Sequence, residues 1–191
     1  MNETGREKFN RYKKYINFLS SIISLLPNGF IQKLFLFFRN TTGKKGLLIR
    51  YMFIRNLTKK CGDNVSIHPN VYFFNLQNVE LGSNISIHPM CYIEGAGGLI
   101  IGNNVSIAHA TSILTTNHTW DDANVPIKYN KEILKKVIIE DDVWIGSGCR
   151  VLAGVILKKR TVLAAGAVLN KSFPSHSVLG GIPAKVIKNN I

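Results

Sequence analysis

A six-residue repeat runs through the chain from about residue 61 to about residue 170. Each hexad opens with an aliphatic residue, and a small or β-branched residue stands four positions later. Such repeats are typical of a parallel β-helix, in which each hexad makes one strand and one turn and three hexads close a triangular coil of about 18 residues. The hexads occupy residues 67–72, 81–86, 87–92, 101–106, 107–112, 145–150, 151–156 and 163–168. The expected fold class is therefore all-β, with stacked aliphatic side chains inside the shaft.

The turns of the expected shaft are rich in Gly and Asn, which adopt left-handed dihedrals at little cost. One turn reads Leu81-Gly82-Ser83-Asn84, and its counterpart Ile101-Gly102-Asn103-Asn104 follows 20 residues later. This spacing predicts that two extra residues bulge from that coil.

The repeat stops at His118 and resumes after residue 136. The polar segment between them is expected to leave the shaft as an excursion over residues 118–136. A rigid scaffold that breaks its repeat to display a histidine is a candidate place for proton-transfer chemistry. His118 is therefore the candidate general base. The nearby Asn117, Asp121 and Asp122 could orient its ring or contact a substrate, and the sequence does not choose among them.

The formal net charge of +13 is concentrated in residues 1–60, which hold 13 Lys and Arg against 2 Asp and Glu. Residues 61–191 hold 11 against 9. A basic character confined to one end gives little support to a nucleic-acid-binding function, and no nucleic-acid partner is expected. The cysteines are widely spaced without a CxxC pair, so they are expected to be buried thiols and not a disulfide framework or a zinc site.

Residues 1–60 are expected to form a short helical segment ahead of a shaft that occupies residues 61–191. Helices are predicted over residues 16–26 and 30–38, separated by a Pro-Asn-Gly turn. Residues 44–60 mix aromatic and basic side chains. They could lie on an anionic membrane or pack on the shaft or a neighbouring subunit, because both need the same amphipathic composition. Without a recognisable signal peptide or bilayer span, we expect a cytoplasmic protein, at most peripheral on the membrane.

These hexads resemble those of the hexapeptide-repeat acyltransferases, whose fold is a left-handed parallel β-helix. The resemblance covers roughly residues 61–188 and includes two more specific motifs. One is Val143-Trp144-Ile145-Gly146-Ser147, and the other comprises residues 164–174 followed by residues 180–188. Together they are similar to the galactoside and maltose acetyltransferases and to their relatives in surface-polysaccharide pathways. Residues 1–60 do not resemble the short N-terminal region of that branch.

The resemblance implies an enzyme that takes acetyl-CoA as co-substrate in a groove between adjacent subunits of a homotrimer, with His118 as the base. It places acetyl-CoA contacts on six positions, where lysines meet the phosphates as point charges. These positions are Ser147, Ala165, Asn170, Lys171, Lys185 and Lys188. The family usually has Thr where this chain has Asn170, and often Arg where it has Lys185 and Lys188.

The resemblance also suggests contacts with the acceptor of the acetyl group. His88 stands where that branch carries an acceptor-binding Asn, and Glu94 falls near an acidic acceptor contact. Asn117 and Asp121 of the excursion are further candidates, and Trp144 is a candidate wall of the thioester pocket. His68 and His88 are each followed by Pro at one 20-residue step, which stacked turns explain without a ligand.

Within this family, we expect transfer of an acetyl group to a sugar hydroxyl in lipopolysaccharide, O-antigen or capsule biosynthesis. The alternatives are N-acetylation of an aminosugar nucleotide, acetylation of a xenobiotic, and a non-catalytic scaffold docked on the membrane. Serine acetylation is disfavoured, because that family carries a much larger helical N-terminal domain. A zinc-dependent carbonic anhydrase would need three converging histidines. The spacing of His68, His88, His109 and His118 does not match that family, so no metal is expected.

Overall fold

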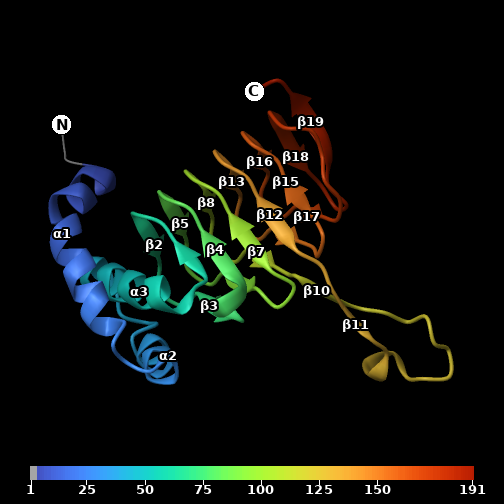
Figure 1. Cartoon of the computed structure of the whole chain (residues 1–191). Helices are drawn as coiled ribbons and strands as arrows, with labels where there is room; N and C mark the ends of the chain where they lie inside the picture. Colours follow the sequence, from blue (N-terminus) through green and yellow to red (C-terminus); the bar gives the residue numbers. More distant parts are fainter. Residues whose placement is uncertain (1–3) are drawn as a thin grey trace.

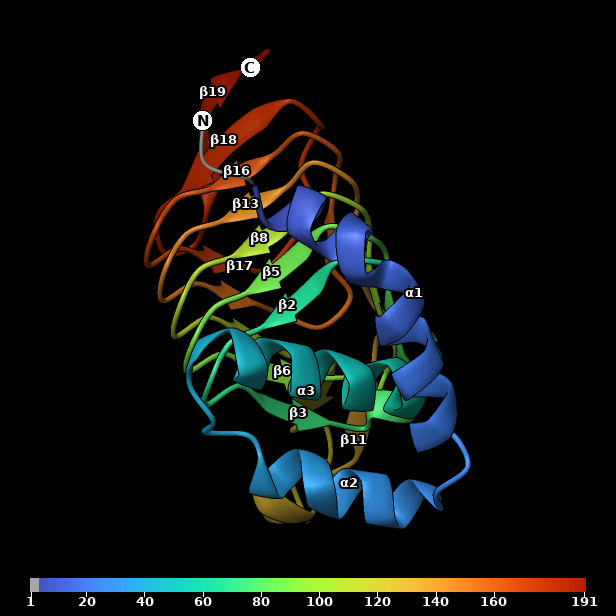
Figure 2. The same cartoon turned by 90° about the vertical axis from the view of Figure 1, so that its left-hand side faces the viewer.

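The structure is a computed structural model that describes residues 4–191. Three helices come first, and the rest of the chain winds into a parallel β-helix (Figure 1). The helices are α1 (Gly5–Ile23), α2 (Asn28–Phe37) and α3 (Gly43–Leu57). They gather at the end of the β-helix that is opposite the C-terminal strands (Figures 1 and 2).

Three sheets form the faces of the β-helix. The first face contains β1 (Lys60–Cys61), β4 (Val79–Leu81), β7 (Leu99–Ile101), β12 (Val137–Ile139) and β15 (Ile156–Leu157). The second contains β2 (Val65–Ile67), β5 (Ile85–Ile87), β8 (Ser106–Ile107), β13 (Trp144–Ile145), β16 (Val162–Leu163), β18 (Ser177–Gly180) and the antiparallel β19 (Lys185–Asn189). The third contains β3 (Tyr72–Phe74), β6 (Tyr92–Glu94), β9 (Ser112–Ile113), β14 (Arg150–Val151) and β17 (Val168–Leu169). The expected all-β fold, a parallel β-helix of hexapeptide repeats, is confirmed.

The interior of the β-helix is filled by columns of aliphatic side chains from the hexad openings. One column is fully buried, with each member 0% exposed, and consists of Ile67, Ile87, Ile107, Ile145 and Leu163. Each such side chain contributes about 1.5–3 kcal/mol relative to leaving it in water. The small residues four positions later, such as Cys91 and Cys149, are equally buried. The periodicity of the sequence thus corresponds directly to the core.

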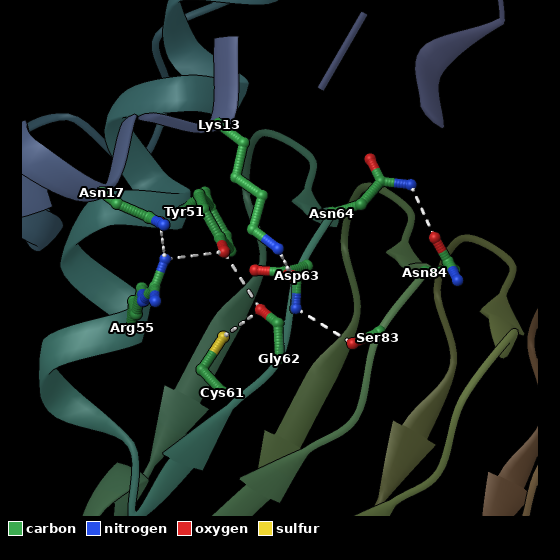
Figure 3. A network of polar contacts seen from close by, with 10 residues as sticks. All are labelled: Lys13, Asn17, Tyr51, Arg55, Cys61, Gly62, Asp63, Asn64, Ser83 and Asn84. Atoms are coloured by element: carbon green, nitrogen blue, oxygen red, sulfur yellow. Dashed lines mark hydrogen bonds and ion pairs between the residues drawn. The ribbon is translucent and has the colours of Figure 1, made fainter. Parts of the chain in front are cut away.

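The corners of the triangle require left-handed backbone, which explains the Asn and Gly residues of the repeat. Asn64, Asn84 and Asn104 have φ values of 54°, 58° and 56°. Their amides also form a ladder, in which Nδ2 of one donates to Oδ1 of the next at 3.1 Å (Figure 3 shows its first step). A glycine is required at position 146 for a different reason, since a Cβ there would lie 2.6 Å from the backbone nitrogen of Ala165. The close stacking of consecutive coils therefore excludes any side chain at position 146.

Coil length changes along the shaft. In the first coils the paired residues are 20 apart, as in Val65 and Ile85, and after the excursion they are 18 apart, as in Trp144 and Val162. In the coil that runs from Leu81 to Ile101, residues 95–98 connect the third face to the first and hold the extra residues, and the short 3-10 helix η1 (Leu76–Asn78) stands at the same place in the preceding coil. The predicted bulge is therefore present.

The N-terminal helices differ from the two predicted ranges in two respects, one of which is a third helix, α3, that neither range includes. The first helix begins at Gly5, well before the predicted start at residue 16. Thr4 and Glu7 form a capping box, with the Glu7 amide donating to Oγ1 of Thr4 and the Thr4 amide donating to Oε2 of Glu7. This cap stabilises a helical start in a segment that has few apolar residues to bury. In the residues described, no helix is long and apolar enough to cross a membrane.

Helix α3 attaches the helices to the β-helix. The guanidinium of Arg50 is fully buried and donates to the carbonyl of Ile67 in β2 at 2.8 Å. It also donates to the carbonyl of Thr41 at 2.6 Å, which fixes the α2–α3 connection. Lys13 of α1 also forms an ion pair with Asp63, which follows β1, at 2.6 Å (Figure 3). The segment thus packs on the shaft, which was one of the two roles expected for it.

Candidate active site

The excursion is a two-stranded antiparallel hairpin that projects away from the shaft (Figure 1). Its strands are β10 (Thr116–His118) and β11 (Glu132–Leu134), and a 3-10 turn, η2 (Ile127–Tyr129), lies in the loop between them. The hairpin leaves at the corner where the third face ends and the first face begins. The backbone amide of Thr119 donates to the carbonyl of Lys131 at 2.9 Å, which extends the pairing beyond His118. His118 therefore lies on paired strand and not on a free loop.

His118 faces a carboxylate across the hairpin. It is the register partner of Glu132, and its Nε2 atom lies 3.5 Å from Oε1 of that residue. Both side chains are accessible, with relative exposures of 53% and 59%. A carboxylate in this position can hold the orientation of the ring while the ring takes a proton. Solvent exposure limits the strength of the pair.

The base of the hairpin is held by Glu94, at the end of β6. Its carboxylate accepts hydrogen bonds from the amides of Thr115 and Thr116 at 2.8 and 3.1 Å, and from Oγ1 of Thr116 at 2.8 Å. Sequence analysis placed Glu94 in contact with the acceptor. In the structure this half-buried carboxylate fixes the point from which the hairpin leaves the shaft, and its contact with an acceptor stays a prediction.

The polar candidates near His118 have different surroundings. Asn117 is adjacent to His118 on β10, so its side chain points to the opposite side of the ribbon. Asp122 accepts a hydrogen bond from the amide of Asn124 at 3.0 Å, and its own amide donates to Asn130 at 3.1 Å, so it shapes the loop. Asp121 is exposed in the same loop. None of these takes the place of Glu132 opposite the ring.

Three of the six positions expected to contact acetyl-CoA meet in one hollow. This hollow has a volume of about 180 Å³ and lies at the C-terminal end of the shaft. Its lining residues are Asn170, Lys171, Phe173, Pro183, Ala184, Lys185 and Val186. The amide of Ala184 donates to the carbonyl of Val168 at 2.8 Å, which holds the returning tail over β17. Two lysines beside an apolar wall suit a ligand that carries phosphates next to an organic chain.

The other expected contacts lie outside the hollow. Ser147 and Ala165 occupy equivalent corner positions in consecutive coils, where the amide of Gly166 donates to the carbonyl of Ser147 at 2.8 Å. This corner joins the second face to the third, whereas Lys171 lies at the other edge of the third face, beyond the end of β17. Lys188 is exposed on β19, in register with Val178. Trp144 projects from the second face with 55% of its surface exposed.

His88, a predicted acceptor contact, lies at a different corner of the shaft from the hairpin. His88 follows β5 at the corner between the second and third faces, and its ring stacks on that of His68 with centroids 4.7 Å apart. Burial lowers the pKa of His68, with smaller contributions from His88 and Arg50. One subunit therefore does not bring His88 and His118 together.

Other reactive groups are less suited to chemistry. Burial raises the pKa of the Cys61 thiol to about 12 and that of the Cys91 thiol to about 11, so both stay protonated near neutral pH. Cys149 is fully buried. Over residues 4–191, no cluster of three or more His, Cys, Asp or Glu side chains could hold a metal ion.

Glu132, opposite His118, was not among the residues predicted from the sequence. The relevant signal is the return of apolar residues, Ile133 and Leu134, after the polar loop, which allows pairing with residues 116–118. Without the register of that pairing, any acidic residue of the excursion was an equal candidate.

The fold and the hollow define a hexapeptide-repeat transferase. The model of the bacterial transferase hexapeptide family (six repeats) matches residues 136–171. A putative acetyltransferase, YJL218W of Saccharomyces cerevisiae, is 36% identical over 140 residues, which cover 71% of this chain and 68% of the relative. The chain therefore belongs to the hexapeptide-repeat acetyltransferase family. A second relative, the 2,3,4,5-tetrahydropyridine-2,6-dicarboxylate N-acetyltransferase of Staphylococcus aureus, is 50% identical over 52 residues, but these span only 22% of its length.

Solved structures agree with this assignment. A hexapeptide-repeat acetyltransferase of Vibrio cholerae in complex with acetyl-CoA has a TM-score of 0.75 at 25% identity, covering 84% of this chain and 85% of the other. A galactoside acetyltransferase in complex with coenzyme A has a TM-score of 0.75 at 26% identity, covering 83% and 78%. A maltose O-acetyltransferase of Clostridium difficile 630 has a TM-score of 0.71 at 26% identity, covering 87% and 88%. The protein is an acetyltransferase that uses acetyl-CoA.

Proposed function

We propose that the enzyme transfers the acetyl group of acetyl-CoA to a hydroxyl group of a sugar or glycan, with His118 as the general base. The observation that carries this proposal is the placement of His118 opposite Glu132 on a braced hairpin. The similarity to galactoside and maltose acetyltransferases supports a sugar hydroxyl as acceptor. The surface-polysaccharide context expected from the motifs is part of the same proposal.

The arrangement suits the following chemistry. The thioester of acetyl-CoA supplies the acetyl group. His118 takes the proton of the acceptor hydroxyl as its oxygen attacks the thioester carbonyl, and Glu132 balances the charge on the imidazolium. The carbon–sulfur bond breaks, and the proton returns from His118 to the sulfur, which leaves an acetyl ester and free CoA. Lys171 and Lys185 would bind the phosphates.

The hairpin also supports a shared site. It projects away from its own shaft (Figure 1), where a neighbouring subunit could meet it, and His118 is the last residue of its strand β10. The hairpin base and Lys171 lie at the same corner of the shaft, because Thr115 and Lys171 each stand two residues beyond strands β9 and β17 of the third face. We therefore propose a homotrimer in which each groove lies between two subunits.

Labelled acetyl-CoA tests the acceptor class directly. The protein should transfer label to oligosaccharides or nucleotide sugars that have free hydroxyl groups but no amine, and mild base should release that label as acetate from an ester. Transfer only to aminosugar nucleotides, as a base-stable amide, would replace this proposal with N-acetylation. That alternative has one observation in its favour, the local identity to an N-acetyltransferase noted above.

A further inference from the structure

The outer faces of α1 and α2 expose large apolar side chains that the fold does not use. We call six of them the cap face: Tyr15, Phe18 and Ile22 of α1, Leu25 of the turn that follows α1, and Phe30 and Phe37 of α2. Leu25 and Phe37 are 82% and 80% exposed, and each of the others is about half exposed or more. These helices lie at the end of the shaft that Figure 2 turns toward the viewer. The end of the molecule opposite the C-terminal hollow is therefore partly apolar.

The cap face is distinct from the packing side of the same helices. Helix α1 buries Ile16 and Ser20, while Tyr15, Phe18 and Ile22 follow helical spacing on the other side. Helix α2 likewise buries Ile31 and Phe35 and exposes Phe30 and Phe37. A helix with apolar residues on two opposite sides is expected to have a partner on each. The β-helix and α3 supply only one of these partners.

Basic side chains accompany the cap face. Lys14 precedes Phe18 by one turn of α1, and Lys33 stands between Phe30 and Phe37 on the outside of α2. Lys44 and Lys45 are exposed at the start of α3. Within residues 4–191, none of these four lysines has an ion-pair partner at 4.0 Å or less.

Acidic groups do not offset this charge. Glu7 is the one acidic residue in the described part of the segment, residues 4–60, and its carboxylate is engaged in the capping box of α1. The N-terminal helical segment therefore combines the exposed aromatic and aliphatic side chains of the cap face with a strong excess of positive charge.

We propose that the cap face binds the surface of an anionic lipid bilayer. The apolar side chains would insert at the level of the headgroups, and the lysines would lie against the anionic lipids. A second copy of the same face is a poor occupant, because self-association would bring two segments of the same positive charge together. The enzyme would thus act with its shaft standing on the membrane, close to lipid-linked acceptors.

Vesicle co-sedimentation of the full-length protein tests this proposal. With phosphatidylcholine vesicles containing phosphatidylglycerol, the protein should sediment at low salt, and with pure phosphatidylcholine it should remain in the supernatant. Raising the salt concentration should release it, because added ions shorten the screening length. Truncation is a poor test, since α3 closes the end of the hydrophobic core.

Point variants separate charge from apolar insertion. Each lysine near an anionic surface strengthens binding about fivefold, so Lys14→Gln together with Lys33→Gln should weaken it about 30-fold. The matched control is Lys158→Gln with Lys159→Gln. This variant removes two exposed lysines that follow β15, in the C-terminal part of the shaft, and it should leave binding unchanged. Phe18→Gln with Leu25→Gln should also weaken binding by at least about tenfold, whereas Met90→Gln, at another exposed apolar position, should not.

Three results would overturn the proposal. One is a protein that stays in the supernatant with anionic vesicles at low salt. Another is equal binding by the Lys14/Lys33 and Lys158/Lys159 variants. The third is a change of oligomeric mass in light scattering for Phe18→Gln with Leu25→Gln while vesicle binding persists, which would make the cap face a contact between subunits. Turnover with a soluble acceptor should be the same in all these variants, so the outcome is independent of the catalytic proposal.

Discussion

The carboxylate of Glu132 lies 3.5 Å from Nε2 of His118, directly across the two strands of the hairpin. Both residues leave the ribbon on the same side, because directly paired residues of antiparallel strands share a face. The hairpin therefore carries an acid–base pair and not an isolated histidine. Because both side chains are exposed, solvent competes with the interaction between them. This competition sets an upper limit on what Glu132 can contribute to catalysis by His118.

Glu132→Gln is expected to lower kcat about two- to fivefold, since an exposed ion pair is worth at most about 1 kcal/mol. The Michaelis constant for acetyl-CoA should not change, because Glu132 faces His118 and is not among the residues that line the hollow. Steady-state kinetics with Lys131→Gln as the neighbouring control measures both quantities. A larger KM for acetyl-CoA with unchanged kcat would show that Glu132 has another role.

His118→Ala is expected to lower kcat by about 10²–10⁴, the usual contribution of a general base. Binding of acetyl-CoA, measured by calorimetry, should stay close to that of the wild type. The variant should also keep the melting temperature, because the His118 side chain is exposed and makes no hydrogen bond that supports the fold. A variant that retains more than about half of the wild-type activity would remove His118 from the mechanism.

Glu94→Ala is expected to loosen the hairpin at its base. Loss of the carboxylate leaves the amides of Thr115 and Thr116 without their acceptor, at a cost of about 1–3 kcal/mol for each buried group. The misplaced His118 should lower kcat about 10- to 100-fold, although Glu94 does not touch it. Limited digestion with trypsin at Lys128 or Lys131 should become faster.

Glu80→Ala provides the control for Glu94. It removes a carboxylate from the same shaft that binds only the exposed Lys59. If Glu94→Ala resembles Glu80→Ala in activity and in digestion rate, the hairpin does not depend on Glu94.

The shaft was predictable because the hexad encodes it locally. Each opening residue, such as Ile87 or Ile145, becomes a buried column member, and each corner Asn or Gly supplies the left-handed backbone that the turn requires. The hollow was partly predictable for the same reason, since Asn170, Lys171 and Lys185 belong to motifs with a fixed place on the shaft. Local pattern and global fold coincide in such repeats.

The remaining features depend on contacts between distant segments. In the sequence Arg50 is one of many basic residues of the N-terminal segment, yet it is fully buried and donates to carbonyls of the turn that follows α2 and of β2. For Glu94 the resemblance suggests a contact with the acceptor, but it gives no sign that this carboxylate also anchors the hairpin. Neither role has a periodic signal, because each is created only when the helices or the hairpin dock.

Lys171→Ala and Lys185→Ala are each expected to raise the KM for acetyl-CoA about tenfold, the value of one hydrogen bond to a charged group, with kcat nearly unchanged. Lys188→Ala is the informative comparison, because the family motif includes it while the hollow does not. It should behave more like the wild type. If Lys188→Ala has the largest effect, the phosphates bind along β19 and not in the hollow.

The proposed shared groove can be tested by mixing two inactive proteins. His118→Ala lacks the base, and a variant with Lys171→Glu and Lys185→Glu should lack acetyl-CoA binding. In a random mixture of trimers, each mixed trimer contains one groove with both parts intact, so about a quarter of all sites should recover. Co-expression with two affinity tags, followed by an activity assay and light scattering of the mixed species, measures this recovery. A trimer that recovers no activity would place His118 and the hollow of one subunit in the same site, and a fully active monomer would exclude the shared groove altogether.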